Sequence, residues 1–404
     1  MERFGMGTRI YSGAGAVGAL AGFGAKRVFL VTDPYFYSNG TAARVAESCH
    51  AEAIEFFSDV RPDPTVELAA AGTARLKAFG PDLVVALGGG SAMDCAKAMV
   101  YFEGSNLRLA AIPTTSGSGS EVTDFAILTH GEVKHPLVDE KLRPWAAILD
   151  SELLMELPKG LIADTGFDVL AHALEAAVAR NAGAFSDALA RAAFCTAWRE
   201  LPRSYRGEQG ARLPMHEAAT MAGLAFTHAG LGLCHAMAHA LGGKFHVPHG
   251  RLNAILLPAV IGFNAQACGT KYADFARSAG IGGSVDTIAV RNLRGHLARL
   301  RRELGLPETL AEAGVDPAAV RSAGPEIVKA ALADPCCAAN PRAVDAGAVL
   351  QILAEVTGHG GSAERGAGCG DHVYPDGGLP ADGGKPGGGL CGARNGHCPA
   401  GDPV

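Results

Sequence analysis

The stretch from Gly230 to Asn253, GLGLCHAMAHALGGKFHVPHGRLN, contains three histidines whose spacing could bind a metal ion. His235 and His239 are four residues apart, so a helix would place both imidazoles on one face, about one turn apart. His249 follows a Gly-Gly pair and a proline, and a loop after the helix could fold its imidazole back toward the first two. The spacing therefore predicts a cluster of imidazoles.

A second pair of potential ligands, Asp168 and His172, lies upstream in the run DTGFDVLAH. A carboxylate and an imidazole four residues apart again share one helix face. Together with His235 and His249 they would form a mixed oxygen and nitrogen site, which suits Fe(II) or Zn(II) better than Ca or Mg. The alternative is that these are ordinary core or surface histidines, and spacing alone leaves both interpretations open.

The composition is that of a soluble globular enzyme with room for two domains. The chain has 404 residues, of which 48% are hydrophobic and 19% charged, and its formal net charge is -6. This balance argues against a nucleic-acid or membrane-surface partner. The N-terminus, MERFGMGTRIYSGAG, lacks the apolar core of a secretory signal, and no apolar run approaches the roughly 20 residues of a membrane span. The ten cysteines form no CxxC pair, so we expect free thiols in a cytoplasmic protein.

Residues 1–157 alternate short apolar runs with helical stretches. The runs at 27–33, 82–87, 109–112 and 146–150 are predicted to be buried strands. Strand, turn and helix in repetition predict a parallel sheet with helices on its faces, and ligands of such folds bind beyond the carboxyl ends of the strands.

The remainder of the chain has a different pattern. Residues 158–357 carry Ala- and Leu-rich stretches with helical periodicity and no convincing strand, so we expect an all-helical domain, with the active site in a cleft between the halves. Residues 358–404 are rich in glycine and proline and predict a disordered tail. Its abrupt start raises the hypothesis of translation in a shifted frame, which resequencing the 3′ end of the gene would test.

Two polar turns in the first half could bind a nucleotide. GGGS at 88–91 follows a strand and opens a helix, where backbone N–H groups favour a phosphate, although a glycine turn alone is weak evidence and this is not G-x-G-x-x-G. PTTSGSGSEVT at 113–123 adds hydroxyls that would suit a pyrophosphate and a ribose. Asp33, at the end of its strand, could bond ribose hydroxyls and repel a 2′-phosphate, which favours NAD over NADP; a plain turn aspartate is the alternative.

On these residues the chain resembles the iron-dependent (group III) alcohol dehydrogenases. The matching motifs are GGGSAMD at 88–94, PTTSGSGSEVT at 113–123, TGFDVLAHALEA at 165–176, GLGLCHAMAHALGG and HVPHGRLNAILLP within 230–258, and Asn340-Pro341-Arg342. Within the family the chain looks closest to the propanol dehydrogenases of propanediol-degrading microcompartments. The runs TRIYSGAGAV, SDVRPDPT and THAGLGLCHAMAHALGGKFHVPHG carry that similarity.

The resemblance implies a fold like that of dehydroquinate synthases and iron-containing alcohol dehydrogenases, with an α/β NAD-binding domain and an all-α metal-binding domain. It implies Fe(2+), with Zn(2+) as the alternative, and NAD as cofactors. The metal ligands would be Asp168, His172, His235 and His249, and His239 would relay a proton or position the substrate. The positions that match cofactor contacts are Asp33, Asp63, Gly89, Gly90, Ser91, Thr114, Thr115, Thr123 and Lys134.

Three features depart from the family pattern. Asp63 stands where the family often has Asn, which keeps the acceptor but loses the amide donor. His228 stands where Asn or Gln is expected, and we favour a variant helix end over a residue of the substrate pocket. The segment from 358 onward has no counterpart in the family.

The reaction implied is the interconversion of short-chain primary alcohols and aldehydes, with propanal reduction by NADH as the physiological case. The metal would act as a Lewis acid on the alkoxide while hydride passes to or from the nicotinamide. The small apolar residues near the metal motif favour short, uncharged substrates; they are Ala225, Phe226, Leu231 and Leu233.

The alternatives are a glycerol dehydrogenase-like polyol oxidoreductase, a lyase like dehydroquinate synthase, and a non-catalytic assembly protein of a microcompartment. For the enzyme we expect a cytoplasmic homo-oligomer, a dimer or larger, with microcompartment shell proteins as candidate partners.

Overall fold

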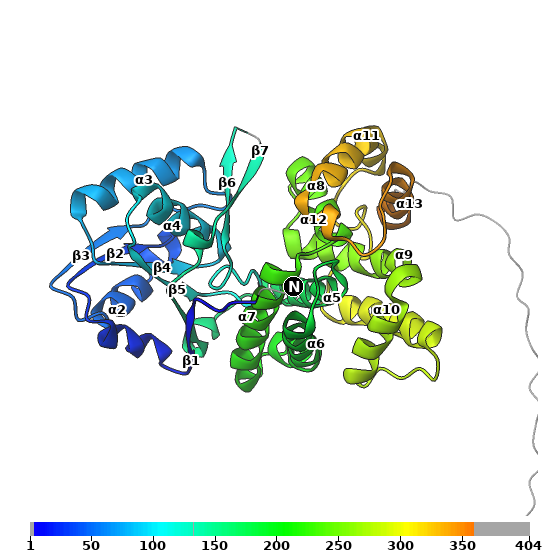
Figure 1. Cartoon of the computed structure of the whole chain (residues 1–404), viewed down its shortest axis with the longest axis horizontal. Coiled ribbons are helices and arrows are strands. Elements are labelled where there is room, and N and C mark those ends of the chain that lie inside the picture. The colour runs from blue at the N-terminus through cyan, green and yellow to red at the C-terminus, as the bar shows by residue number, and fades with distance from the viewer. Residues whose placement is uncertain (1–3, 132, 359–404) are drawn as a thin grey trace, which may run out of the picture. The chain divides into compact units, whose positions relative to one another are not determined.

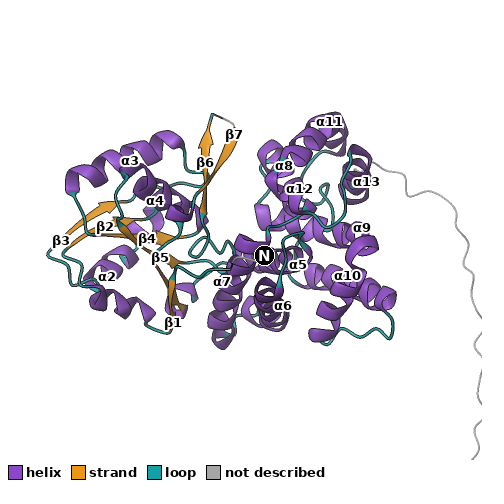
Figure 2. Ribbon diagram, in the orientation of Figure 1, coloured by secondary structure: helices purple, strands orange, loops and turns teal. Residues whose placement is uncertain are grey.

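The structure is a computed structural model, and it describes residues 4–131 and 133–358. The predicted tail therefore lies outside the described residues. A six-stranded sheet, in which all strands are parallel, forms the N-terminal part (Figures 1 and 2). Its strands are β1 (Arg9–Gly13), β2 (Arg27–Val31), β3 (Ala53–Phe57), β4 (Leu83–Gly88), β5 (Arg108–Pro113) and β8 (Ala146–Asp150), in the order β1-β8-β5-β4-β2-β3. The prediction of a parallel α/β sheet is confirmed.

The strands are apolar along their whole length because both faces of the sheet are covered. In β2, Val28 and Leu30 belong to one buried cluster, while Phe29 and Val31 belong to another on the opposite face. The helices and 3-10 turns of this part are η1 (Ala16–Phe23), α1 (Pro34–Ser38), α2 (Thr41–Glu47), α3 (Val66–Phe79), α4 (Gly90–Glu103), η2 (Glu140–Leu142) and η3 (Ser151–Leu154).

A two-stranded antiparallel hairpin, β6 (Phe125–His130) and β7 (Val133–Val138), interrupts the alternation and was not predicted. The Thr129 N–H donates to the Pro64 carbonyl at 2.9 Å, which fastens the hairpin to the loop before α3. Because both strands of the hairpin are only partly buried, the sequence lacks the apolar run that marks the strands of the sheet.

Helices alone make up the second part, as predicted: no strand occurs in residues 158–358 as the structure describes them (Figure 2). They are α5 (Lys159–Val178), α6 (Ala184–Tyr205), η4 (Gln209–Ala211), α7 (Arg212–Ala229), α8 (Leu233–Phe245), α9 (His249–Ser278), α10 (Asp286–Glu303), α11 (Pro317–Ala333), α12 (Pro335–Ala339) and α13 (Ala346–Thr357). Helix α5 is buried on almost every side among α6, α7 and α9, so polar side chains on it lie inside the core.

Helix α9 is the one described helix with the length and hydropathy of a membrane span. More than half of its most apolar window is buried in the helical core, however, and core helices of soluble proteins can have the same length and hydropathy.

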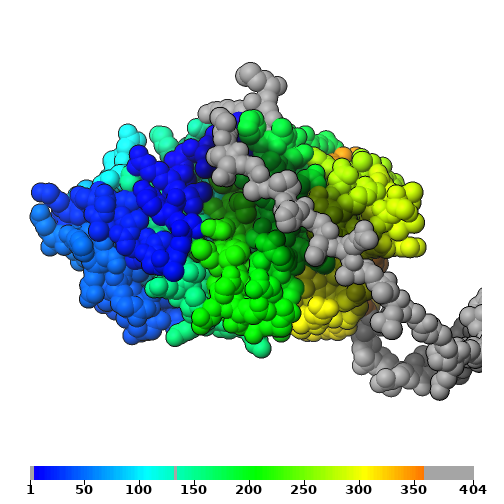
Figure 3. Space-filling view, turned by 90° about the horizontal axis from the view of Figure 1, so that it is seen from below, coloured from blue at the N-terminus to red at the C-terminus, as the bar shows by residue number. Residues whose placement is uncertain are grey.

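The glycine- and serine-rich loop after β5 packs directly on α7. Gly119 has φ +65, and a Cβ on it would lie 2.7 Å from the Cα of Gly223. The Thr220 hydroxyl donates to Glu121 Oε1 at 2.6 Å, and Ser116 Oγ lies 3.1 Å from His216 Nδ1. These contacts join the sheet to the helices. The N-terminal segment, dark blue in Figure 3, also meets the green surface of α6 and α7.

Candidate metal centre and cofactor site

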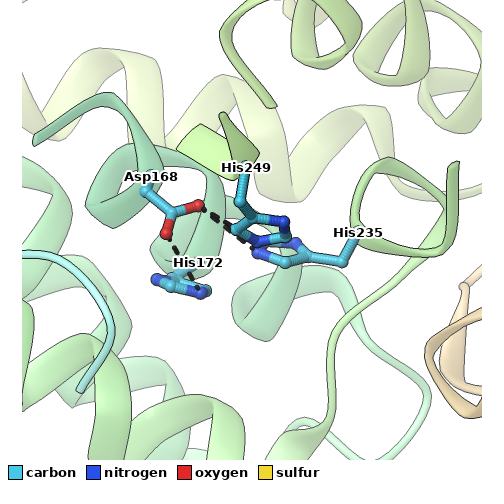
Figure 4. Close-up of side chains that lie close together, drawn as sticks. All are labelled: Asp168, His172, His235 and His249. Carbon is cyan, nitrogen blue, oxygen red and sulfur yellow. Dashed lines mark ion pairs between the residues drawn. The ribbon is translucent and has the colours of Figure 1, made fainter. Parts of the chain in front are cut away.

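Three helices deliver the four predicted ligands to one point. Asp168 and His172 lie one turn apart on α5, His235 lies in the first turn of α8, and His249 is the first residue of α9. Their side chains point toward one another (Figure 4). The third imidazole thus comes from the start of a new helix rather than from a loop, since Pro248 is the N-cap residue of α9.

The distances between the ligand atoms suit a single ion. Asp168 Oδ1 lies 3.7 Å from His235 Nε2 and 3.6 Å from His249 Nε2, and Oδ2 lies 4.0 Å from His172 Nε2. Two atoms that each lie about 2.1 Å from one metal ion are roughly 3–4 Å apart. The four groups therefore need little movement to share an ion.

The hydrogen bonding of the cluster also fits a cation. The Asn253 Nδ2 group lies 2.6 Å from Asp168 Oδ1 and 3.1 Å from the Nε2 atoms of His235 and His249. An amide nitrogen carries two hydrogens, which cannot satisfy three acceptors. The cluster is buried apart from His249, whose side chain is 39% exposed and marks the open side. Three imidazole nitrogens and one carboxylate in such a place are a donor set for Fe(II) or Zn(II).

Electrostatics hold two of the ligands, His172 and Asp168, in forms that bind metal. Burial lowers the pKa of His172 to about 4, so its imidazole is neutral at pH 7. Burial opposes ionisation of Asp168, but the neighbouring imidazoles of His172, His249 and His235 hold its pKa well below its usual range. The carboxylate therefore stays charged. Burial opposes protonation of His235, but hydrogen bonds to Asp168 and Glu175 raise its pKa to about 9, so a metal ion must displace its proton.

His239, the predicted catalytic residue, lies beside the cluster without joining it. Its ring centroid is 5.2 Å from that of His249, and its side chain is 34% exposed. Its Nδ1 lies 2.8 Å from Asp334 Oδ2, and Asp334 Oδ1 accepts from the Cys336 N–H at the start of α12. With Nδ1 held by a carboxylate, Nε2 is the nitrogen left for substrate.

The structure adds three residues that the sequence did not single out. Asn253 lies among the ligands, Asp334 bonds His239, and Glu175 bonds His235 through Nδ1 at 2.6 Å. Glu175 lies on the same face of α5 as Asp168 and His172, a signal that the sequence did contain. Asp334 is 95 residues from its histidine, and no local pattern predicts that contact.

Most of the predicted cofactor residues gather at the carboxyl ends of the strands. Gly88 pairs with Pro113, and the Thr114 N–H donates to the Gly88 carbonyl at 2.9 Å, so the two predicted turns lie side by side. A cavity of about 660 Å³ opens there. Its lining includes Asp33, Gly89, Thr114 and Thr115 from the sheet, and Leu157, Pro158 and Leu161 from the start of α5. Gly90 and Ser91 form the adjoining first turn of α4.

Three of the predicted cofactor residues have other partners. Thr123 is fully buried, and its hydroxyl accepts from the Lys97 ammonium at 2.9 Å. Asp63 and Lys134 bond each other at 2.6 Å, between the loop before α3 and strand β7. Asp63 has φ +56, a conformation that Asn and Asp adopt more readily than most residues. The geometry thus brings these two together, and Thr123 is not presented to the cavity.

His228 lies in the last turn of α7, where its Nδ1 bonds the Leu224 carbonyl at 2.9 Å. Its ring stacks on Phe4 with centroids 4.1 Å apart, and its Nε2 accepts from the Gly5 N–H. These contacts place it at a helix end that holds the N-terminal segment, in line with the interpretation favoured from the sequence.

Aromatic side chains form an apolar wall beside the ligands. The Phe226 ring lies 4.5 Å from the His172 ring and 6.0 Å from that of Phe125 on β6. Both Leu231 and Leu233 are buried. The surroundings of His172 are therefore apolar.

Comparison with known families covers nearly the whole described chain. Residues 7–151 match the model described as iron-containing alcohol dehydrogenase. Residues 162–357 match the C-terminal model of the Fe-containing alcohol dehydrogenase family.

Individual proteins of known activity or structure are similar to this chain over most of its length. The chain is 40% identical over 370 residues to the 1-propanol dehydrogenase PduQ of Citrobacter freundii, covering 88% of this chain and all of that protein. A crystal structure of 1,3-propanediol oxidoreductase superposes with a TM-score of 0.84 at 30% identity, over 88% of this chain and all of that one. Sulfoacetaldehyde reductase from Bifidobacterium kashiwanohense, solved with NAD+, has a TM-score of 0.80 at 26% identity, over 88% of this chain and 98% of that one.

Proposed function

The chain belongs to the iron-containing alcohol dehydrogenase family, and on that premise we propose that this metal-dependent enzyme interconverts 1-propanol and propanal with NAD as hydride carrier. The observation that carries the proposal is the convergence of one carboxylate and three imidazoles from α5, α8 and α9. A separate cavity of about 660 Å³ at the carboxyl ends of the strands has room for a nucleotide. The likeness to 1-propanol dehydrogenase over the full length of that relative supports the substrate.

We propose Asp168, His172, His235 and His249 as the residues that hold the metal. Divalent iron held there would supply Lewis acidity, which lowers the pKa of an alcohol and polarises an aldehyde carbonyl. The protein would orient the ligands and exclude water from the metal: Phe226 covers His172 and keeps water from that side.

His239 is the proposed proton carrier. Asp334 holds its Nδ1–H, so that Nε2 can take the alcohol proton in oxidation and return it in reduction. The exposure of the side chain gives that proton a path to solvent.

The proposed cofactor contacts are those of the two adjacent turns together with Asp33, whose carboxylate favours NAD over NADP. They are Asp33, Gly89, Gly90, Ser91, Thr114 and Thr115. Asp63, Lys134 and Thr123 belong to the proposed set with less support, since each has a protein partner.

We keep the division into an NAD-binding domain of residues 1–157 and a metal-binding domain of residues 158–357 as a proposal. We also propose a cytoplasmic homo-oligomer. Association with microcompartment shell proteins rests on the sequence likeness to propanol dehydrogenases, and co-purification with them would test it.

The experiment is a substrate and cofactor series with the iron-loaded enzyme. We expect kcat/KM to be highest for propanal among ethanal, propanal, butanal and glyceraldehyde, and higher with NADH than with NADPH. Asp33→Asn keeps the acceptor that caps α1 but removes the charge, so it should raise the relative use of NADPH. A preference for glyceraldehyde or for glycerol oxidation would instead support the polyol alternative.

A further inference from the structure

Glu175 lies on α5, in the turn after His172, and only 1% of its surface is exposed. Both carboxylate oxygens face the start of α8. Oε1 accepts from the Cys234 N–H at 2.7 Å, and Oε2 accepts from the Gly232 N–H at 3.1 Å. Oε2 also lies 3.3 Å from the His235 backbone nitrogen and 2.6 Å from its Nδ1.

The Glu175 carboxylate caps the first turn of α8, so its contact with His235 is part of a larger hydrogen-bonded arrangement. The first N–H groups of a helix have no partner within the helix, and a carboxylate satisfies them and favours the helix dipole. A Cβ at Gly232 would lie 2.7 Å from Glu175 Oε1, so only glycine lets the backbone come this close.

The hydrogen bond to Glu175 determines which nitrogen of His235 is free to bind a metal. When Nδ1–H donates to Glu175, the lone pair is on Nε2, and that atom faces Asp168 Oδ1 at 3.7 Å. A carboxylate behind a ligating imidazole fixes its tautomer and orientation and makes it a stronger donor.

We propose that Glu175 is a positioning residue of the metal centre. It ties the ligand-bearing turn of α8 to α5, which carries Asp168 and His172, and it presents Nε2 of His235 to the metal. This inference rests on the proposed ligand set.

The test is the affinity of the metal-free, full-length protein for Zn(II), measured by competition with a chromophoric chelator. We expect Glu175→Gln to bind Zn(II) roughly 10–100-fold more weakly, the usual effect of removing such a partner. Glu200→Gln is the matched control: Glu200 is also a buried carboxylate, but its bonds go to Arg199 and Arg203 on its own helix. Its affinity should equal that of the wild type.

A double-mutant cycle separates positioning from general damage. If Glu175 acts through His235, Glu175→Gln should weaken Zn(II) binding little further in a His235→Ala background. An equal loss in both backgrounds, or an affinity of Glu175→Gln within twofold of wild type, overturns the inference. Unchanged binding by His235→Ala alone would overturn the ligand set instead, so the two failures are distinguishable.

If the Glu175→Gln variant does not fold, a measurement on the wild-type protein still tests the proposal. The ¹⁵N chemical shifts of His235 in the metal-free protein, recorded above its pKa of about 9 so that the ring is neutral, report its tautomer, with His235→Ala giving the assignment. We expect a protonated Nδ1. An unprotonated Nδ1 in the neutral ring would contradict the proposal.

Discussion

Two histidines near the metal site, His235 and His239, each bond a carboxylate through Nδ1, with different consequences. Glu175 and His235 are both buried, and their contact prepares a ligand. Asp334 and His239 are half-buried and face the open side, where a proton can leave. The four-residue spacings predicted that Asp168 with His172, and His235 with His239, share helix faces, because a helix repeat is a local property. The carboxylate partners of His235 and His239 come from other parts of the chain: Glu175 shares a face of α5 with Asp168 and His172, which the sequence indicates, whereas only the packing reveals Asp334.

The pair of His239 and Asp334 gives a prediction about turnover. Asp334→Asn keeps an acceptor for Nδ1–H but loses the charge that stabilises a protonated ring. We expect kcat for propanol oxidation to fall about tenfold or more, with KM little changed, since general acid–base catalysis contributes ~10²–10⁴-fold. Steady-state kinetics over pH 6–10 measure it.

Asp316→Asn is the control, because Asp316 also caps a helix through its side chain, and among the described residues it bonds the Ala318 N–H rather than a histidine. An Asp334→Asn enzyme with normal kcat and full metal content would show that His239 does not carry the proton.

At the scale of elements, the site depends on the close crossing of α5 and the first turn of α9. A Cβ on Gly250 would lie 2.0 Å from the Asp164 carbonyl oxygen and 3.3 Å from Asp168 Cβ. Glycine at this point therefore allows His249, its neighbour in sequence, to lie beside Asp168. The Arg251 guanidinium, which bonds Asp164 at 3.1 and 3.0 Å, holds the same crossing.

Gly250→Ala should separate the two helices and weaken the site. We expect a loss of about 1–3 kcal/mol in the free energy of unfolding, typical of overpacking, together with weaker Zn(II) binding. Denaturant unfolding and chelator competition measure the two effects. Gly243→Ala on α8 meets no described atom within 4 Å of the added Cβ, so it should leave Zn(II) binding unchanged and should not lower the free energy of unfolding, since alanine favours a helix over glycine. If the two variants had the same free energy of unfolding and the same Zn(II) affinity, the crossing of α5 and α9 would not hold the metal site together.

Elements that are buried on both faces could be predicted from the sequence, and others could not. The strands β2, β4, β5 and β8 are continuous apolar runs, and all four were predicted. The edge strands β1 and β3 and the hairpin are partly exposed, so their residues are mixed. The start of α9 at His249 was missed because the Gly-Gly and Pro248 signals suggested only a loop.

At the scale of the whole molecule, the loop after β5 and helix α7 join the sheet to the helical part, and His216 lies in that junction. It is buried, and its Nδ1 lies 3.1 Å from Ser116 Oγ. Burial lowers the pKa of His216 to about 4 from 6.5. The folded protein is therefore more stable with the His216 ring neutral than with it protonated.

This shift predicts an acid sensitivity with a defined window. A depressed native pKa contributes stability that is present above pH 6.5 and is lost as the pH falls toward 4, because the unfolded chain binds the proton more readily. Between pH 7 and 4.5 the wild type should lose about 2 kcal/mol more than His216→Gln. Denaturant unfolding at both values measures the difference. His135→Gln, at an exposed position on β7, should behave as wild type, and a parallel loss in His216→Gln would refute the assignment.

We propose above all that a divalent metal held by Asp168, His172, His235 and His249 makes this chain an NAD-linked alcohol dehydrogenase. The direct measurement is anaerobic oxidation of NADH by propanal, with enzyme stripped by EDTA and then given Fe(II), Zn(II) or nothing. We predict no turnover without metal, recovery with Fe(II), and neither metal content nor recovery in His249→Ala. Turnover by the stripped enzyme, or full metal content and activity in His249→Ala, would contradict the account.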